Sequence, residues 1–469
     1  MGRNGPLWVE LGLPSLAAVA GLGVLGVWVR SYYAPIVVAP RPLNVAKPTA
    51  APTQEPPPRS LSPTSRQPAV QATPAVALAT EVPGSWPSFR GPDRDNVAKD
   101  AKMPGGIQDL KMLWEVPLGE GYAGPAVAKG RVFVLDYDAA GKQDLLRCFS
   151  LADGKELWRN GYPVEIKRNH GISRTVPATD GEVVVSLGPK CHVLAADVRT
   201  GKTLWFVDLV KEYGTTVPEW YAGQCPLIDD GKVILAPAGN ALLVALDLRT
   251  GKPLWKTPNP QGWKMTHTSI ATATVEGERQ YVYAGSGGVA GVSAKDGALR
   301  WETTEWTVNT ATVPTPVPME AGRLFLCGGY NAGSMLLALS KTGAKVASRI
   351  APEVFGSDQQ TPVYFKGSLY GVAPGGELVC LSPEGKRRWS SGTKARFGLG
   401  PYLVADGMLI LMNDSGAMTI AEASDEGYRP LGSIQVRQGR ESWGPMALAG
   451  NRLLVRDIES MACIQLGAG

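Results

Sequence analysis

The stretch ALDLRTGKPLW at residues 245–255 places a tight turn and a tryptophan four residues apart. An apolar run leads into Thr-Gly-Lys, and the glycine supplies the positive φ that a tight hairpin turn needs. The phrase occurs again as AADVRTGKTLW at 195–205, and in shorter form as DGKELW at 153–158, DGALRW at 296–301 and EGKRRW at 384–389. A phrase that repeats along the chain predicts one supersecondary unit used many times, instead of several unrelated domains.

Six tryptophans mark the register of the repeat. Their spacings are 44, 47, 50, 46 and 88 residues, and the last is two periods of 44: Trp114, Trp158, Trp205, Trp255, Trp301 and Trp389. Most units open on a proline: Pro125, Pro177, Pro226, Pro316, Pro362, Pro401 and Pro445. One more unit opens near residues 268–273 without its proline, so the chain contains eight units of about 44 residues.

Strands within each unit are short and rich in β-branched residues, as in RVFVL at 131–135 and KVILAP at 232–237. Four such strands per unit match a propeller blade, whose sheet packs face to face with its neighbours around an axis. The tryptophan begins the outermost strand, where a large flat side chain can wedge against the next blade. We therefore predict an all-β chain, folded as an eight-bladed β-propeller with four-stranded blades.

The last unit, which begins at residue 442, has room for only three strands. We expect the stretch LKMLWEVPL at 110–118 to supply the fourth, so that an N-terminal strand in the last blade closes the ring. Closure in this way leaves no free sheet edge between the first and last blades.

Three cysteines occupy one repeated position, at the start of CFSL, CLSP and CIQL: Cys148, Cys380 and Cys463. Other units have a small residue at this position: Ala195, Ala245, Gly291 and Ala338. A slot for a small side chain predicts that these three cysteines are buried free thiols. The sequence leaves open the disulfide state of Cys191, Cys225 and Cys327.

Composition divides the chain into three parts. Residues 1–30 contain an uncharged 19-residue stretch, about long enough to cross a bilayer, which predicts a transmembrane anchor; a cleaved signal segment is the alternative. Residues 31–85 are proline-rich and form a predicted disordered linker, and residues 86–469 form the propeller. Basic residues are more numerous after the apolar stretch than before it, so charge alone does not favour export of the propeller.

The full phrase A-x-D-x-x-T-G-K-x-x-W resembles the tryptophan-docking motif of the PQQ-like, or quinoprotein alcohol dehydrogenase-like, eight-bladed β-propellers. The resemblance covers about residues 86–466, and WPSFRGPDRDNVA at 86–98 is similar to the segment that precedes many bacterial propellers of this group. Such proteins are often anchored or secreted, which implies a membrane-anchored propeller on the periplasmic or extracellular face. The family contains PQQ-dependent dehydrogenases and non-enzymatic members, among them the B subunit of the outer-membrane barrel-assembly machinery.

The resemblance also implies which cofactor site a dehydrogenase of this family contains. Its quinone stacks between a tryptophan and a vicinal Cys-Cys disulfide, with Ca²⁺ held by Glu, Asn and Asp. This sequence has no Cys-Cys pair, and the spacing of its carboxylates singles out no calcium site. We therefore expect no enzyme, no catalytic residue, no metal and no cofactor; PQQ with Ca²⁺ is the alternative. His170 and His267 could bind a metal, but two ligands so far apart indicate loop histidines instead.

Loops that lead into the inner strands of a propeller gather around one mouth of its channel. Twelve residues of these loops are candidates for ligand or partner binding: His170, Arg174, Trp220, Tyr221, Gln224, Trp263, His267, Asn309, Asp358, Gln359, Arg396 and Trp443. Exposed aromatic residues with arginine suit a binding surface. A net charge of +5 without a basic run predicts no nucleic-acid binding.

The sequence thus predicts a monomeric, non-catalytic protein-interaction scaffold in envelope or outer-membrane protein assembly. The alternatives are a PQQ-dependent dehydrogenase and a propeller that binds a small molecule or a glycan.

Overall fold

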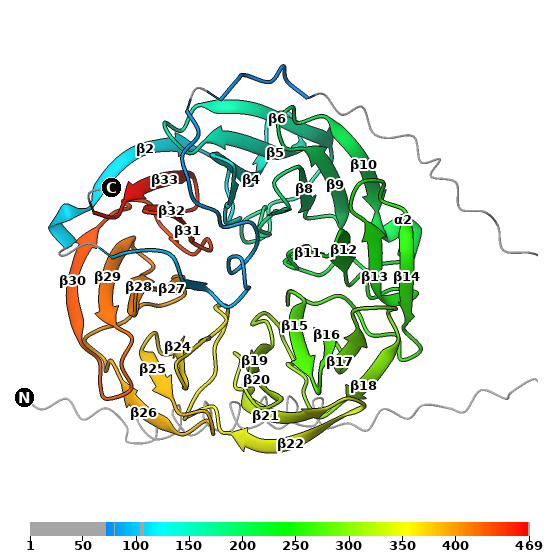
Figure 1. The fold of residues 1–469 in the computed structure, drawn as a ribbon, viewed down its shortest axis with the longest axis vertical. Helices are drawn as coiled ribbons and strands as arrows, with labels where there is room; N and C mark the ends of the chain where they lie inside the picture. Colours follow the sequence, from blue (N-terminus) through cyan, green and yellow to red (C-terminus); the bar gives the residue numbers. More distant parts are fainter. Residues whose placement is uncertain (1–71, 79, 104–106, 468–469) are drawn as a thin grey trace, which may run out of the picture. The chain divides into compact units, whose positions relative to one another are not determined.

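Eight β-sheets surround a central channel, and each is a blade that runs from the channel outward (Figure 1). The computed structural model describes residues 72–78, 80–103 and 107–467. The predicted all-β fold of eight four-stranded blades is confirmed within these residues, and blade seven has one additional strand. The predicted membrane segment at residues 1–30 lies outside the described residues. Among the residues that are described, no helix is long and apolar enough to cross a membrane.

The strands follow one another in chain order, and each blade begins at the channel. Blade one comprises β3 (Ala126–Ala128), β4 (Arg131–Asp138), β5 (Gln143–Ser150) and β6 (Glu156–Pro163). Blade two comprises β7 (Ala178–Thr179), β8 (Val183–Leu187), β9 (His192–Asp197) and β10 (Thr203–Asp208), followed by the short helix α2 (Leu209–Tyr213). Blade three comprises β11 (Leu227–Asp229), β12 (Lys232–Leu235), β13 (Ala241–Asp247) and β14 (Pro253–Pro258). Blade four comprises β15 (Ala271–Val275), β16 (Glu278–Gly285), β17 (Gly288–Ser293) and β18 (Leu299–Thr303).

Blades five to seven repeat this order. Blade five comprises β19 (Val317–Met319), β20 (Arg323–Gly328), β21 (Gly333–Ser340) and β22 (Gly343–Ile350). Blade six comprises β23 (Val363–Phe365), β24 (Ser368–Val372), β25 (Leu378–Leu381) and β26 (Arg387–Ser390). Blade seven comprises β27 (Tyr402–Ala405), β28 (Met408–Met412), β29 (Ala417–Glu422) and β30 (Pro430–Gln435).

The eighth sheet combines strands from two distant parts of the chain. Its inner strands are β31 (Ala447–Ala449), β32 (Arg452–Arg456) and β33 (Ser460–Gln465). Its outermost strand is β2 (Lys111–Pro117), which follows the short 3-10 turn η1 (Ile107–Asp109) and pairs antiparallel with β33. Figure 1 shows β2 at the rim beside β33.

Four of the six repeated tryptophans donate a hydrogen bond from their own blade to the next one. Trp158 of β6 is 1 % exposed, and its indole Nε1 donates to the carbonyl of Val198 in blade two at 3.0 Å. The ring also lies against Gly201 of that blade, where an added Cβ would be 2.6 Å from Trp158 Cδ2. Gly201 has a φ of 70°, so the repeated turn both reverses the chain and leaves room for the indole.

Three more tryptophans make the same hydrogen bond to the next blade, whereas Trp255 Nε1 has no hydrogen-bond partner in the described part of the chain. Trp114 donates to Leu151 and Trp205 donates to Leu248, at 3.1 and 2.9 Å. Trp389 donates to Ser424 at 3.0 Å. Trp301 differs, since its Nε1 donates to Gln280 of its own blade. The expectation that the tryptophan begins the outer strand and wedges against the next blade therefore holds for most blades.

The small residue of the repeat lies directly opposite the tryptophan. Cys148 pairs with Trp158, Ala195 pairs with Trp205 and Cys463 pairs with Trp114 across adjacent strands. A larger side chain would meet the indole, since a Cβ added at Gly291 would be 2.2 Å from Trp301. All six cysteines of the chain are buried and free, as predicted for Cys148, Cys380 and Cys463.

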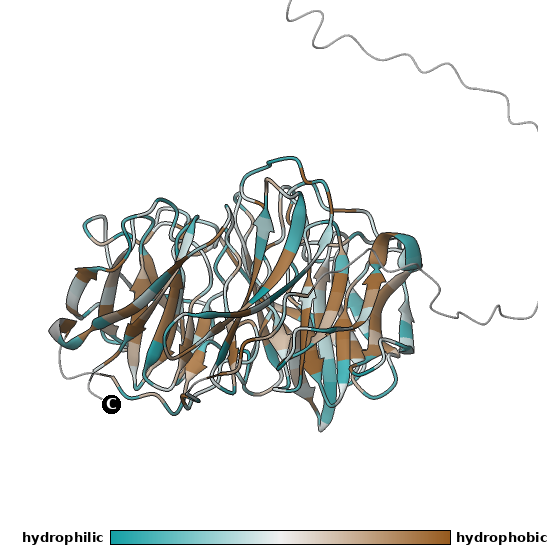
Figure 2. Cartoon of the chain, turned by 90° about the horizontal axis from the view of Figure 1, so that it is seen from above, coloured by the Kyte–Doolittle hydropathy of each residue, from teal (hydrophilic) through white to brown (hydrophobic). Residues whose placement is uncertain are grey.

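Apolar side chains fill the interfaces between neighbouring blades. Figure 2 shows hydrophobic residues along the strands and hydrophilic residues in the turns at the two faces of the ring. One cluster of buried residues runs continuously through blades seven, eight, one and two. The channel loops are thereby held on a rigid support.

The segment that precedes the first blade crosses the channel (Figure 1). Trp86 bonds to Val127 of blade one at 2.9 Å, and the buried Arg90 donates to the carbonyls of Thr361 and Pro362 in blade six at 2.9 and 3.0 Å. The short strand β1 (Val97–Ala98) then pairs parallel with β27, as a fifth strand on the channel side of blade seven. The sequence did not predict this strand.

Candidate functional site

The loops that lead into the inner strands enclose a cavity of about 540 Å³ at one mouth of the channel. We call it the mouth cavity. Its volume lies in the range of roughly 300–1,000 Å³ that is usual for ligand pockets. Phe89, from the segment that crosses the channel, also lines it.

Six of the twelve predicted site residues line the mouth cavity: His170, Arg174, Trp220, His267, Gln359 and Trp443. They come from loops that precede five different inner strands, which explains why residues so far apart in sequence meet.

Three of the predicted residues have a packing role. Tyr221 is buried with Ile166, and its hydroxyl donates to the carbonyl of Lys167. Gln224 is fully buried, and its side-chain amide bonds to both the N–H and the carbonyl of Ala236. Trp263 is 5 % exposed and packs in the core between blades three and four.

The other three predicted residues lie outside the cavity. Asn309 and Arg396 are exposed to solvent. Asp358 lines a separate, much smaller recess beside Gly398.

Twelve further residues line the cavity without having been predicted, and those with an aromatic or amide side chain are Phe89, Tyr122, Tyr330 and Gln360. Tyr122 lies in the loop before Pro125, so the rule that selected the other loops could have found it. Tyr330 lies in the turn between β20 and β21, a loop of a different kind. Phe89 reaches the cavity only because its segment crosses the channel, which no local pattern indicates.

Two stacked rings form the firmest part of the cavity wall. Tyr122 and Trp443 stack with their centroids 5.3 Å apart and their planes 30° apart. The Tyr122 hydroxyl donates to Glu441 at 2.6 Å, and Trp443 Nε1 donates to Asp414 at 2.6 Å. Burial and Glu441 raise the pKa of Tyr122, so its hydroxyl keeps its proton at physiological pH. The Tyr122 hydroxyl and the Trp443 N–H are both bonded to carboxylates outside the stack. The ring faces that do not stack on each other therefore remain available for contact.

Arg174 brings a positive charge to this wall. Its guanidinium carbon lies 5.8 Å from the Tyr122 ring centroid, and its Nη2 donates to the carbonyls of Asn169, His170 and Gly171. Its Nε is buried and has no hydrogen-bond partner within the described part of the chain. Desolvation lowers the pKa of Arg174, although the guanidinium remains charged at neutral pH.

Several non-glycine residues at the mouth have a left-handed backbone. His170 has a φ of 55°, Tyr330 of 54° and Glu441 of 58°. Such conformations are unfavourable for residues with a Cβ and persist where the surrounding structure holds them. Two of the three present a ring to the cavity, and Glu441 holds Tyr122.

Burial changes the pKa of a thiol and of an imidazole that line the cavity. Burial raises the pKa of the Cys225 thiol to about 11, so the thiol is protonated and a weak nucleophile at neutral pH. Burial and the charge of Arg174 lower the pKa of His267 to about 4, so this imidazole is neutral and can exchange hydrogen bonds with a ligand.

The residues do not fit the quinone site that the resemblance implies for dehydrogenases. The chain has no vicinal cysteine pair to stack on a quinone. In the part of the chain that the structure describes, no three His, Cys, Asp or Glu side chains converge to hold a metal ion. Function without a cofactor stays a prediction.

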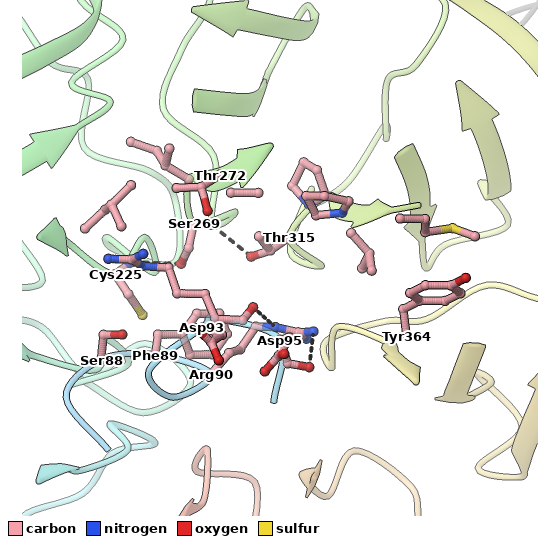
Figure 3. A pocket seen from close by; sticks show the side chains of 18 of the residues that line it. Ser88, Phe89, Arg90, Asp93, Asp95, Cys225, Ser269, Thr272, Thr315 and Tyr364 are labelled. Atoms are coloured by element: carbon pink, nitrogen blue, oxygen red, sulfur yellow. Dashed lines mark hydrogen bonds between the residues drawn. The ribbon is translucent and has the colours of Figure 1, made fainter. Parts of the chain in front are cut away.

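A second cavity, of about 410 Å³, lies on the other side of Phe89. Figure 3 shows it, with Arg90 among its lining residues and the backbone N–H of Ser269 bonded to Thr315. Phe89, Cys225, Ser269 and Thr315 line both cavities, so they separate the mouth cavity from this one.

Comparison with known proteins supports the fold. The PQQ_2 family model, described as "Outer membrane protein assembly factor BamB", matches residues 141–338. The crystal structure of BamB from Moraxella catarrhalis is similar with a TM-score of 0.53 and 16 % identity, over 76 % of this chain and 97 % of that chain. The predicted resemblance to the PQQ-like propeller family is confirmed.

Two more solved structures are similar at a lower level. The computationally designed Ika8 protein gives a TM-score of 0.49 and 11 % identity, over 76 % of this chain and 99 % of that chain. The quinohemoprotein alcohol dehydrogenase of Comamonas testosteroni gives 0.45 and 12 %, over 84 % and 82 %. No curated protein sequence matches the chain significantly.

Proposed function

We propose that this chain is a non-catalytic propeller scaffold that binds a protein partner at its mouth cavity. The stacked pair of Tyr122 and Trp443 beside Arg174 carries the proposal. Aromatic residues and arginine dominate the binding energy of protein interfaces when a rigid surround excludes water from them. Here a closed core of blades supports the rings, and bonds to Glu441 and Asp414 hold them in place.

The family model supports a role in envelope or outer-membrane protein assembly, since its description names an outer-membrane assembly factor. The apolar stretch in residues 1–30 supports a membrane anchor, and the proline-rich linker would let the propeller work at a distance from the membrane. We accordingly propose that the propeller faces the periplasm or the cell exterior.

The pairing of β2 with β33 supports ring closure by an N-terminal strand. In this arrangement blade eight contains strands from both ends of the propeller, and β2 covers the edge of β33. A closed ring of blades would then support the mouth loops when a partner binds to them.

A small molecule or glycan is the second candidate ligand, and the mouth cavity itself favours it. A volume of about 540 Å³ and an unpartnered, buried Arg174 Nε suit a flat ligand with an acceptor group. Such a ligand would stack on Trp443 and accept a hydrogen bond from the guanidinium.

Site-specific cross-linking separates the two functions. With p-benzoylphenylalanine in place of Trp220, irradiation of native envelopes should join the chain to one defined protein, and Trp443→Ala should reduce the yield. The same label in place of Leu431, an exposed residue on β30, is the control and should not yield this product.

Titration of the purified chain with PQQ and Ca²⁺, and with a carbohydrate array, completes the test. Saturable binding of PQQ together with no protein product would overturn the scaffold proposal. Binding of a glycan that shields the fluorescence of Trp443 from a quencher, with no cross-linked protein product, would favour the second candidate.

A further inference from the structure

The outer edge of blade one is covered by a segment of this chain. Residues 72–78 run along β6 at the rim of the ring (Figure 1). The N–H of Thr73 donates to the carbonyl of Arg159 at 3.0 Å, and the N–H of Val76 donates to the carbonyl of Leu157 at 2.9 Å. The N–H of Arg159 donates to the Thr73 hydroxyl at 3.1 Å. An extended, apolar segment is therefore docked on an edge strand.

The outer strand of blade two offers the same edge without such a cover. Trp158 of β6 and Trp205 of β10 pair in the same register with the strand inside them, so Leu204 is the equivalent of Leu157. Leu157 is 3 % exposed, whereas Leu204 is 42 % exposed. Within the described ranges, no backbone hydrogen bond reaches the outer side of β10.

Two more features favour β10 as an edge that accepts a strand. It contains no proline, so each of its residues keeps its N–H, whereas β14 begins and ends with proline. Val210, which follows β10 at the start of α2, is 40 % exposed and extends the apolar surface beyond Leu204.

We propose that the outer edge of β10, residues 203–208, docks an extended apolar segment of a partner protein by strand addition. The backbone of the segment would bond to the outward N–H and carbonyl groups of Leu204 and Phe206, as residues 73–76 bond to Leu157 and Arg159. Its small apolar side chains would cover Leu204. This edge is on the rim and is separate from the mouth cavity, so the inference goes beyond the function proposed above.

A labelled peptide with the sequence of residues 72–78, ATPAVAL, is the probe, and fluorescence anisotropy with the full-length chain is the assay. We expect saturable binding that Leu204→Asp weakens by at least about tenfold, which corresponds to roughly 1.4 kcal/mol. Leu431→Asp is the matched control, because Leu431 is a 59 % exposed leucine on another outer strand, and it should leave binding unchanged. A peptide N-methylated at its single valine, the position of Val76, should not bind, since it lacks the N–H that donates to Leu157 in the covered edge.

Three results would overturn the proposal. The first is the absence of saturable binding up to roughly 1 mM peptide. The second is binding that neither Leu204→Asp nor N-methylation weakens, which would place the peptide elsewhere. The third is self-association of the chain that Leu204→Asp abolishes, since the occupant would then be the same segment of a second copy. Circular dichroism of both variants establishes that each is folded.

Discussion

Replacing Gly201 by alanine should destabilise the propeller more than replacing Gly231, although both glycines have a φ of 70°. An L-residue in this conformation costs roughly 1–2 kcal/mol at either position. At Gly231 the added Cβ has nothing within 4 Å, so this is the whole cost. At Gly201 the Cβ would be 2.6 Å from Trp158 Cδ2, about 1 Å inside normal carbon–carbon contact.

Trp158 cannot easily move away, because it is 1 % exposed and its indole is bonded to Val198. Forcing an extra methyl group into such packing costs roughly 1–3 kcal/mol more. We therefore expect Gly201→Ala to lower the free energy of unfolding by about 2–5 kcal/mol and Gly231→Ala by about 1–2 kcal/mol. Urea denaturation followed by circular dichroism measures both values.

A third variant isolates the contact between blades. In a chain that already carries Trp158→Leu, the excess cost of Gly201→Ala should largely disappear, since the indole that the Cβ meets is gone. Equal costs for Gly201→Ala and Gly231→Ala in the unmodified chain would refute the idea that the repeated glycine exists to seat the tryptophan.

Three further predictions concern charge, closure and thiols. Burial raises the pKa of Asp144 to about 7, so between about pH 4 and 7 the folded chain holds a proton that the unfolded chain has lost, and stability from this group falls as pH rises. Between pH 4 and pH 8, the free energy of unfolding of Asp144→Asn should therefore rise by on the order of 4 kcal/mol relative to that of the unmodified chain, as measured by urea denaturation. A difference in unfolding free energy that stays constant with pH would contradict this. Removal of residues 1–85 should leave a monomer in size-exclusion chromatography, whereas removal of residues 1–118, which also deletes β1 and β2, should expose β33 and cause aggregation; a monomer in both cases would argue against closure by β2. Denatured chain should release six thiols to a thiol reagent without reductant, and any intact disulfide in mass spectrometry would be inconsistent with free, buried cysteines.

The fold could be predicted because its determinants are local and repeated. The glycine turn, the tryptophan and the small residue opposite it recur in fixed register, and each satisfies the same contact in successive blades. The number of blades then follows from the number of repeated units in the sequence.

The mouth was predictable only in part, because side-chain direction in irregular loops has no period. Tyr221 and Trp220 are neighbours, yet a φ of 67° at Tyr221 accompanies a side chain that packs inward while Trp220 lines the cavity. Gln224, one of the predicted binding residues, is fully buried, and its side-chain amide bonds to the backbone of Ala236. Phe89 and β1 depend on contacts with distant blades, which only the folded chain brings together.

The tryptophan contacts do not continue through blade five, and this has a mechanical consequence. Trp301 bonds within blade four, and at the repeated position of β22 a lysine, Lys345, lies opposite Ala338. Trp255 Nε1 has no hydrogen-bond partner in the described part of the chain. The three joints between blade three and blade six therefore lack the hydrogen bond that Trp158 and Trp205 donate to the next blade. This arc of the ring should therefore open first under thermal or mechanical load, and we expect hydrogen–deuterium exchange to be faster in β21 and β22 than in β5 and β6.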